Sequence, residues 1–321
     1  MKMSRDELPL RVGISMCLLG EKVRYDAGHK KDPFITGILG SYFEWIPVCP
    51  ELDVGMGVPR EPVRLTGPPD DPRMIGTKSG TDWTSKMREY AARKVRSLAK
   101  AGLSGYIFKS GSPSCGMERV RVYAKNGVPA KKGRGLFAEA VLRELAVLPV
   151  EEEGRLQDSG LRENFIERVF AYHRLRQLLQ TPLTLRALVE FHSAHKYLLL
   201  AHSPLHYRQL GQVVARAKQL SRAVLEEEYT RRFMEALRVK STVGKNVNVL
   251  HHILGFLKDQ LTTNIRSDIL GIIEDYRQGL IPLVVPVTLL EHHVRINDVA
   301  YIRNQVYLHP HPKELMLRNH V

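Results

Sequence analysis

The stretch "GYIFKSGSPSCG", Gly105 to Gly116, sets an apolar run directly against a polar turn that carries a cysteine. The apolar run is typical of a buried strand, and Gly111 and Pro113 are turn residues that end it before Cys115. Two further apolar runs lead into a cysteine in the same way. They are "LRVGISM" before Cys17 and "YFEWIPV" before Cys49.

Helices are predicted between and after these strands. Apolar residues at helical spacing predict a helix that Thr84 or Ser85 caps and that Gly102 ends. A second helix is predicted over "GLFAEAVLREL", Gly135 to Leu145. Strands that alternate with helices predict an α/β domain with a Rossmann-like, mostly parallel sheet.

Such a sheet would gather the three cysteines, although they lie far apart in the sequence. Ligands of open α/β sheets bind outside the carboxyl ends of the strands, and each cysteine follows such an end. Three unrelated core cysteines are the alternative, because cysteine is a common buried residue. The polar and glycine-containing loops around each cysteine favour a shared site. An odd number of cysteines without a C-x-x-C pair indicates neither a disulfide framework nor a zinc finger.

The character of the sequence changes after "LPVEEEGRLQDSG", Leu148 to Gly160. From about Leu161 onward, helical periodicity continues with few glycines and no convincing strand. We therefore expect an α/β domain over residues 1–157 and an all-α domain over residues 158–321. Most histidines fall in the second domain. We expect them to be helix-face residues satisfied by hydrogen bonds, since no H-E-x-x-H zinc motif occurs.

The chain has a formal net charge of +14, and the excess is spread over both halves. Solubility alone can explain this charge. A polyanionic partner such as RNA is the alternative, because phosphate neutralisation dominates nucleic-acid affinity. The apolar run "LIPLVVPVTLL" is too short to span a bilayer, and the N-terminus does not resemble a secretory leader. We expect a cytoplasmic protein without a membrane partner.

Three cysteines without an obvious fourth ligand suggest an incomplete metal cage. An iron–sulfur cluster ordinarily has four thiolate ligands, so a cluster with three would leave one iron open to a substrate. A zinc ion with three cysteines and a water is the other possibility. Glu51 and Ser112 stand close to Cys49 and Cys115 in the sequence, where a carboxylate could transfer the proton of a water and a hydroxyl could orient that water. Turn-forming roles are the alternative for both side chains.

The motifs "SMCLLGEKVRYD", "VCPELDVGMGVPREPVRL" and "FKSGSPSCG" resemble, in this order and spacing, those of the thiouracil desulfidase family. The resemblance covers nearly the whole first domain. It implies an oxygen-sensitive 4Fe–4S cluster held by Cys17, Cys49 and Cys115, with an open iron that takes the sulfur of a thiocarbonyl. It also implies that Glu51 and Ser112 assist the attack of water on the carbon. The products would be a carbonyl compound and sulfide, without net electron transfer.

The second half resembles the companion domain that is fused to this desulfidase unit, through "FHSAHKYLLLAHSPLHYRQLG", Phe191 to Gly211. Longer fusions of this kind look like enzymes that remove sulfur from 4-thiouridine in tRNA. The leading hypothesis is therefore a tRNA 4-thiouridine desulfidase whose helical domain binds or positions RNA. Desulfidation of free thiouracil or thiouridine nucleotides is the second hypothesis. A non-catalytic RNA-binding protein with a sensing cluster is the third.

A thiolated nucleotide inside folded RNA needs contacts that position it and expose its base. Tyr25 is a candidate for stacking on the base, and core packing is the alternative. Four cationic residues near the motifs are candidate contacts to phosphate or base, with a solvated surface charge as the alternative for each. They are Arg24, Arg60, Lys78 and Lys109.

Overall fold

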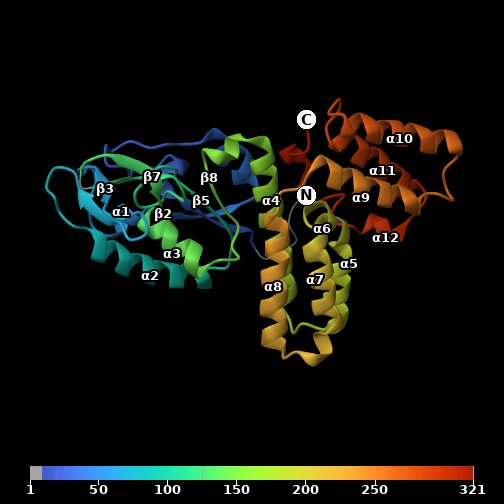
Figure 1. Cartoon of the computed structure of the whole chain (residues 1–321), viewed down its shortest axis with the longest axis horizontal. Coiled ribbons are helices and arrows are strands. Elements are labelled where there is room, and N and C mark those ends of the chain that lie inside the picture. The colour runs from blue at the N-terminus through green and yellow to red at the C-terminus, as the bar shows by residue number, and fades with distance from the viewer. Residues whose placement is uncertain (1–8, 125, 321) are drawn as a thin grey trace. The chain divides into compact units, whose positions relative to one another are not determined.

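A computed structural model of the chain describes residues 9–124 and 126–320. The chain forms two compact units that divide between Asp158 and Ser159 (Figure 1). The boundary expected from the sequence, between residues 157 and 158, lies slightly earlier. The first unit combines sheets with helices and the second is helical, so the predicted fold classes of the two halves are confirmed.

A sheet of four parallel strands organises the first unit. Its strands are β1 (Arg11–Ser15), β2 (Glu44–Val48), β5 (Leu103–Phe108) and β8 (Val150–Glu152). They lie in the order β2-β1-β5-β8. β5 is buried along its whole length, as expected for a strand covered on both faces. Gly13 in β1 is needed beside Tyr106 in β5, because a Cβ at this glycine would lie 2.2 Å from the tyrosine ring.

A second sheet was not predicted from the sequence. Its strands are β3 (Val63–Thr66), β4 (Arg73–Gly76), β6 (Val120–Tyr123) and β7 (Pro129–Gly133). They lie in the order β4-β3-β6-β7, and the two outer pairs are antiparallel. These strands are only four or five residues long and each contains at least one charged residue, so no sustained apolar run marks them in the sequence.

Three α-helices, besides short 3-10 and π helices, complete the described part of the first unit. They are α1 (Pro50–Asp53), α2 (Thr84–Lys100) and α3 (Leu136–Glu144). α2 buries the apolar side that its periodicity predicted and packs against α3, but its expected cap is wrong. The backbone N–H and the hydroxyl of Thr84 donate to the Asp82 carboxylate at 2.9 and 2.5 Å. The Thr84 hydroxyl in turn accepts from the backbone N–H of Met74, so this side chain ties α2 to β4 instead of capping the helix.

The second unit contains nine α-helices among its described residues, besides two short 3-10 helices. They are α4 (Ser159–Gln180), α5 (Leu185–Ala194), α6 (Lys196–His202), α7 (Pro204–Ala215), α8 (Arg222–Arg238), α9 (Val243–Phe256), α10 (Thr263–Arg277), α11 (Val284–Ile296) and α12 (Ala300–Arg303). The N-caps of α5, α7, α8, α9 and α10 are serines or threonines whose hydroxyls accept backbone N–H bonds, which explains where these helices begin. None of the described helices combines the length and apolar composition needed to cross a bilayer.

Buried histidines lie inside this helical unit, and the predicted hydrogen bonds are present at several of them, while Nε2 of His195 and of His311 has no hydrogen-bond partner among the described residues. Nδ1 of His192 meets the Tyr229 hydroxyl at 3.2 Å, and Nδ1 of His195 meets a backbone carbonyl at 2.8 Å. His202 bridges the Val239 carbonyl and the Glu167 carboxylate. These rings therefore belong to the core of the unit.

Candidate active site

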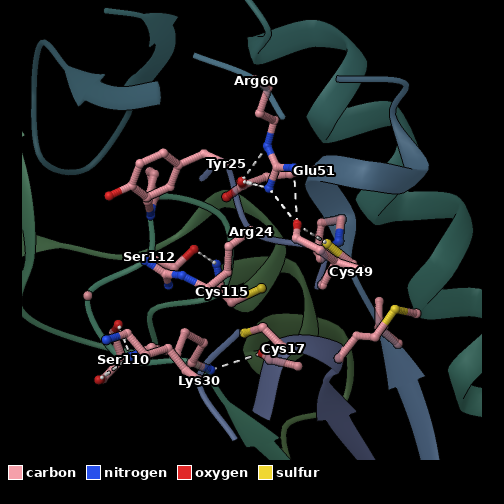
Figure 2. Close-up of a pocket in the computed structure, with 18 residues that line it drawn as sticks. Cys17, Arg24, Tyr25, Lys30, Cys49, Glu51, Arg60, Ser110, Ser112 and Cys115 are labelled. Carbon is pink, nitrogen blue, oxygen red and sulfur yellow. Dashed lines mark hydrogen bonds and ion pairs between the residues drawn. The ribbon is translucent and has the colours of Figure 1, made fainter. Parts of the chain in front are cut away.

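Three cysteine thiols face one pocket at the carboxyl end of the parallel sheet (Figure 2). Cys17 lies in the 3-10 turn Met16–Leu19 directly after β1. Cys49 stands between β2 and α1, and Cys115 lies in the loop after β5. β2 and β5 flank β1 on opposite sides, so the pocket lies where the strand order reverses, the usual ligand position in open α/β sheets. The structure thus gathers the three cysteines, while their role as ligands stays a prediction.

Burial shapes the chemistry of these thiols. All three cysteines are free, and none is more than 9% exposed. Burial raises the pKa of Cys17 to about 11 and raises the pKa values of Cys49 and Cys115 above the usual range. The thiolate forms are therefore unfavourable in this pocket without a nearby positive charge. A bound metal centre supplies such a charge and requires thiolate ligands.

Glu51 is held on both of its carboxylate oxygens. Arg60 donates to Oε2 from Nε at 3.0 Å and from Nη2 at 2.5 Å, and the buried Ser114 hydroxyl donates to Oε1 at 2.5 Å. The Arg60 side chain is 5% exposed and also donates to the carbonyls of Val23 and Gly57. Every guanidinium nitrogen of Arg60 is thus engaged by the chain itself. Arg60 thus fixes Glu51, and the substrate contact expected of Arg60 from the sequence stays a prediction.

Ser112 is the second polar side chain that lines the pocket close to a cysteine. Its hydroxyl oxygen accepts the backbone N–H groups of Ser114 at 3.2 Å and of Cys115 at 3.1 Å. The turn-forming role considered from the sequence is therefore present. These two hydrogen bonds also fix the position of the Ser112 hydroxyl oxygen. The hydroxyl proton stays available for donation into the pocket.

Lys109 lines the pocket, but its ammonium group is occupied. It forms an ion pair with Glu153 and donates to the carbonyl and hydroxyl of Ser110, both at 3.0 Å. Glu153 also accepts from the backbone N–H of Ser110 at 2.7 Å. Lys109 therefore holds the loop that leads to Cys115, and the substrate contact expected of Lys109 from the sequence stays a prediction.

Arg24 and Tyr25 lie at the pocket together with Lys30 (Figure 2). The guanidinium of Arg24 stands 5.3 Å from the Tyr25 ring centroid, and its ion pair partner is the exposed Asp26 at 3.5 Å. Tyr25 is 40% exposed, so core packing does not explain it. These side chains are placed to receive a base or an anionic group. Lys78, by contrast, is not among the residues that line the pocket, and its backbone N–H donates to Glu61.

The donor set of the pocket fits an iron–sulfur cluster. No three His, Cys, Asp or Glu side chains in the described parts of the chain converge tightly enough to hold a single metal ion. A cluster spreads its thiolate ligands over several irons, so its ligands need not converge on one point. Three buried thiols around one pocket match that arrangement.

The comparison with known families bears on this pocket directly. A family model described as "2-thiouracil desulfurase" matches residues 12–153, which contain the whole pocket. The protein YbbK of Bacillus subtilis (strain 168) is 31% identical over 151 residues, which make up 45% of this chain and 97% of YbbK. The chain belongs to the 2-thiouracil desulfurase family. It is thus a desulfidase, an enzyme that removes sulfur from a thiolated pyrimidine.

Other similarities extend the comparison of this desulfidase. A model described as "Protein of unknown function (DUF1722)" matches residues 196–312, within the helical unit. The protein YbgA of Escherichia coli (strain K12) is 31% identical over 155 residues, which make up 47% of this chain and 90% of YbgA. A solved structure described as "[4Fe-4S]-dependent thiouracil desulfidase TudS" is 30% identical, with a TM-score of 0.36 over 46% of this chain and 94% of that chain. The desulfidase therefore carries a family unit followed by a second, helical unit.

Three polar residues that line the desulfidase pocket or hold its lining side chains were missed in the sequence. Ser114 lies in the same short motif as Ser112, but nothing in the sequence shows which hydroxyl faces Glu51. Glu153 is far from Lys109 in the sequence, and only the pairing of β5 with β8 brings the two together. Lys30 carried no motif signal at all.

Proposed function

We propose that the chain is an iron–sulfur-dependent desulfidase that converts 4-thiouridine in tRNA to uridine and sulfide. Cys17, Cys49 and Cys115 would hold a 4Fe–4S cluster. The observation that carries this proposal is the meeting of three buried thiols with Glu51 and Ser112 at one pocket. When bound, a cluster with three cysteine ligands supplies a Lewis-acidic iron with an open position for sulfur.

Glu51 is the group that receives a proton in this reaction. Its carboxylate cannot rotate freely, because Arg60 holds one oxygen and Ser114 the other. The carboxylate takes a proton from the water that attacks the C4 carbon of the pyrimidine. Ser112 donates its hydroxyl proton as a hydrogen bond to that water or to the oxygen that replaces sulfur. Water supplies the carbonyl oxygen and both protons of hydrogen sulfide, so no electrons are gained or lost.

Recognition of RNA is supported by charge and by the pocket. The net charge of +14 favours a polyanionic substrate. Arg24 and Lys30 are cations at the pocket, and no buried carboxylate of the described residues pairs with either of them. Tyr25 offers an exposed ring to a base. These contacts suit a nucleotide with its phosphate better than a free base. Free thiouracil remains the second candidate substrate, because the family description names that compound.

An anaerobic assay tests the proposal. The protein is reconstituted with iron and sulfide, its visible spectrum is recorded, and sulfide release is measured with 4-thiouridine-containing tRNA, a thiouridine nucleotide and thiouracil. We expect cluster absorption and the highest kcat/KM on tRNA. A higher kcat/KM on thiouracil would replace the proposed substrate with the free base. A colourless protein that binds zinc and still releases sulfide would remove the cluster from the proposal.

A further inference from the structure

Two long stretches of the helical unit contain no aspartate or glutamate. They are residues 191–225 and 236–258. Lysines, arginines and histidines recur through both. The first stretch forms α6 and α7, the second forms α9, and α6 packs against both of the other helices. Elements without carboxylates are therefore neighbours in the fold, although they are separated in sequence (Figure 1).

An aromatic surface lies on these elements. Asn248, His252 and Phe256 of α9 are exposed and follow one another at intervals of one helical turn, which places them on the same face. Phe256 stacks on Tyr301 of α12, with ring centroids 5.3 Å apart and an interplanar angle of 26°. Both rings are 42% exposed. Large aromatic rings that keep this much exposure are available to stack on a planar partner.

A cation stands beside the rings. The Lys196 ammonium lies 5.9 Å from the Tyr301 ring centroid and 5.2 Å from that of Tyr197. Lys196 forms no ion pair with any carboxylate of the described residues. The carboxylate close to Tyr301 in sequence, Asp298, is already paired with Arg303. The charge of Lys196 is thus free to meet an anion.

Exposed rings beside unneutralised cations distinguish this surface from an ordinary apolar patch. A protein partner would favour an apolar centre that excludes charge. Single-stranded RNA is complementary to both features of the surface, because its bases stack on aromatic rings and its phosphates pair with cations. We propose that Phe256, Tyr301, His252 and Lys196 form a stacking platform for single-stranded nucleotides of an RNA. This inference rests on the proposed function, since it assigns to the helical unit a contact with the RNA substrate.

Binding of RNA without sulfur tests the platform apart from catalysis. The probes are a fluorescein-labelled oligouridine and an unmodified tRNA transcript, titrated into the full chain by fluorescence anisotropy at several salt concentrations. We expect F256A/Y301A to weaken oligouridine binding at least fivefold, because one stacked base contributes that much or more. The slope of log Kd against log salt should stay unchanged in this variant. K196A should lower that slope by about 0.7, the effect of one phosphate contact on a single strand.

Matched variants separate the platform from general effects. L270A/L280A removes two exposed apolar side chains elsewhere in the unit and K313A removes an exposed lysine, and both should bind oligouridine like the wild type. F256L/Y301L keeps apolar bulk without rings and should still lose binding. Sulfide release from free thiouracil should remain at the wild-type level in every variant, because none of these residues lines the pocket.

Each remaining outcome has a definite meaning. Wild-type affinity in F256A/Y301A or F256L/Y301L would overturn the platform and leave the desulfidase proposal standing. If the reconstituted wild-type chain released no sulfide from any thiolated substrate, while its RNA affinity still depended on Phe256 and Tyr301, the proposed reaction would be overturned and the platform would stand. If light scattering showed a wild-type dimer that F256A/Y301A dissociates without a change in RNA affinity, the surface would be a contact between two copies, and the platform would be overturned.

Discussion

Two carboxylates, one in each unit, have similar partners and different surroundings. Glu51 is held by Arg60 and a serine hydroxyl, and its side chain is 15% exposed at a pocket. Glu167 accepts from Arg318 at 2.8 Å and from His202 at 3.1 Å, and its side chain is 4% exposed among helices. Each carboxylate is neutralised by an arginine. Only Glu51 has space beside it for a reacting molecule.

The different surroundings of Glu51 and Glu167 indicate a different role for each ion pair. Glu167 joins α4 to α6 and to the C-terminal segment that carries Arg318, whose guanidinium also donates to the Tyr307 carbonyl at 2.7 Å. That network fastens chain segments to one another. The network around Glu51 instead fixes one carboxylate at a pocket that three cysteines also line. We therefore expect the two sites to fail in different ways.

The largest expected effect is on turnover at Glu51. E51Q keeps the shape of the side chain but removes its capacity to take a proton, so kcat should fall by about 10²- to 10⁴-fold. The cluster spectrum should remain, because the cysteines are unchanged. Sulfide release and visible absorption of the same reconstituted sample check both points. Full activity in E51Q would assign the proton transfer to another group.

The corresponding change at Glu167 should reduce stability instead. E167Q removes the nearer of the two carboxylates that pair with buried Arg318 and leaves only Glu163, at 3.4 Å. Breaking a buried pair outright typically costs about 3–5 kcal/mol, so with Glu163 still in place we expect a loss of stability below that range. Unfolding of the helical unit, followed by circular dichroism, should show this loss. The tryptophan signal should change less, because both tryptophans, Trp45 and Trp83, lie in the first unit. An E167Q protein as stable as the wild type would contradict the fastening role.

Arg60 offers a smaller test that sharpens the comparison. R60K keeps the positive charge but cannot hold Glu51 and two carbonyls at once, so kcat on thiouracil should fall about tenfold while KM changes little. S114A should act in the same direction through the other oxygen of Glu51. A raised KM with unchanged kcat in R60K would show instead that Arg60 contacts the substrate.

The smallest effect is a difference in acid sensitivity between the units. Burial lowers the pKa of His173 and His192 to about 4 and of His195 to about 3, whereas an unfolded histidine titrates near 6.5. The unfolded chain therefore binds more protons below pH 6.5, and stability is lost as pH falls from about 6.5 toward 4.

Two optical probes locate this loss. Between pH 7 and pH 5 the midpoint of thermal unfolding seen by circular dichroism should fall, while the midpoint seen by tryptophan fluorescence should move less. H192Q should flatten the pH dependence. Equal shifts of both midpoints would mean that the acid sensitivity is not confined to the helical unit.

The sequence predicted the elements that a long apolar run defines. β1, β2 and β5 stand where such runs were found, and the topology of a parallel sheet was enough to bring Cys17, Cys49 and Cys115 to one pocket. The second sheet escaped prediction because its strands are only four or five residues long and each contains at least one charged residue. Periodicity over four residues does not separate a strand from a loop.

The sequence did not show which carboxylates pair with the cationic side chains of the site. Arg60 and Lys109 were expected near the substrate and do lie at the pocket. Their N–H groups are engaged by Glu51 and Glu153, partners that only the folded chain brings into reach. A cation in a motif is therefore weak evidence for ligand binding until its carboxylates are located.

Arg60 also connects the segment that carries Tyr25, which forms the rim of the pocket, to the Glu51 carboxylate. Its backbone N–H donates to the Tyr25 carbonyl at 3.0 Å, and its guanidinium holds the Val23 carbonyl and the Glu51 carboxylate together. The segment around Tyr25 and the carboxylate are thus mechanically linked. A rim that swings outward to admit a large substrate would pull Glu51 away from its working position.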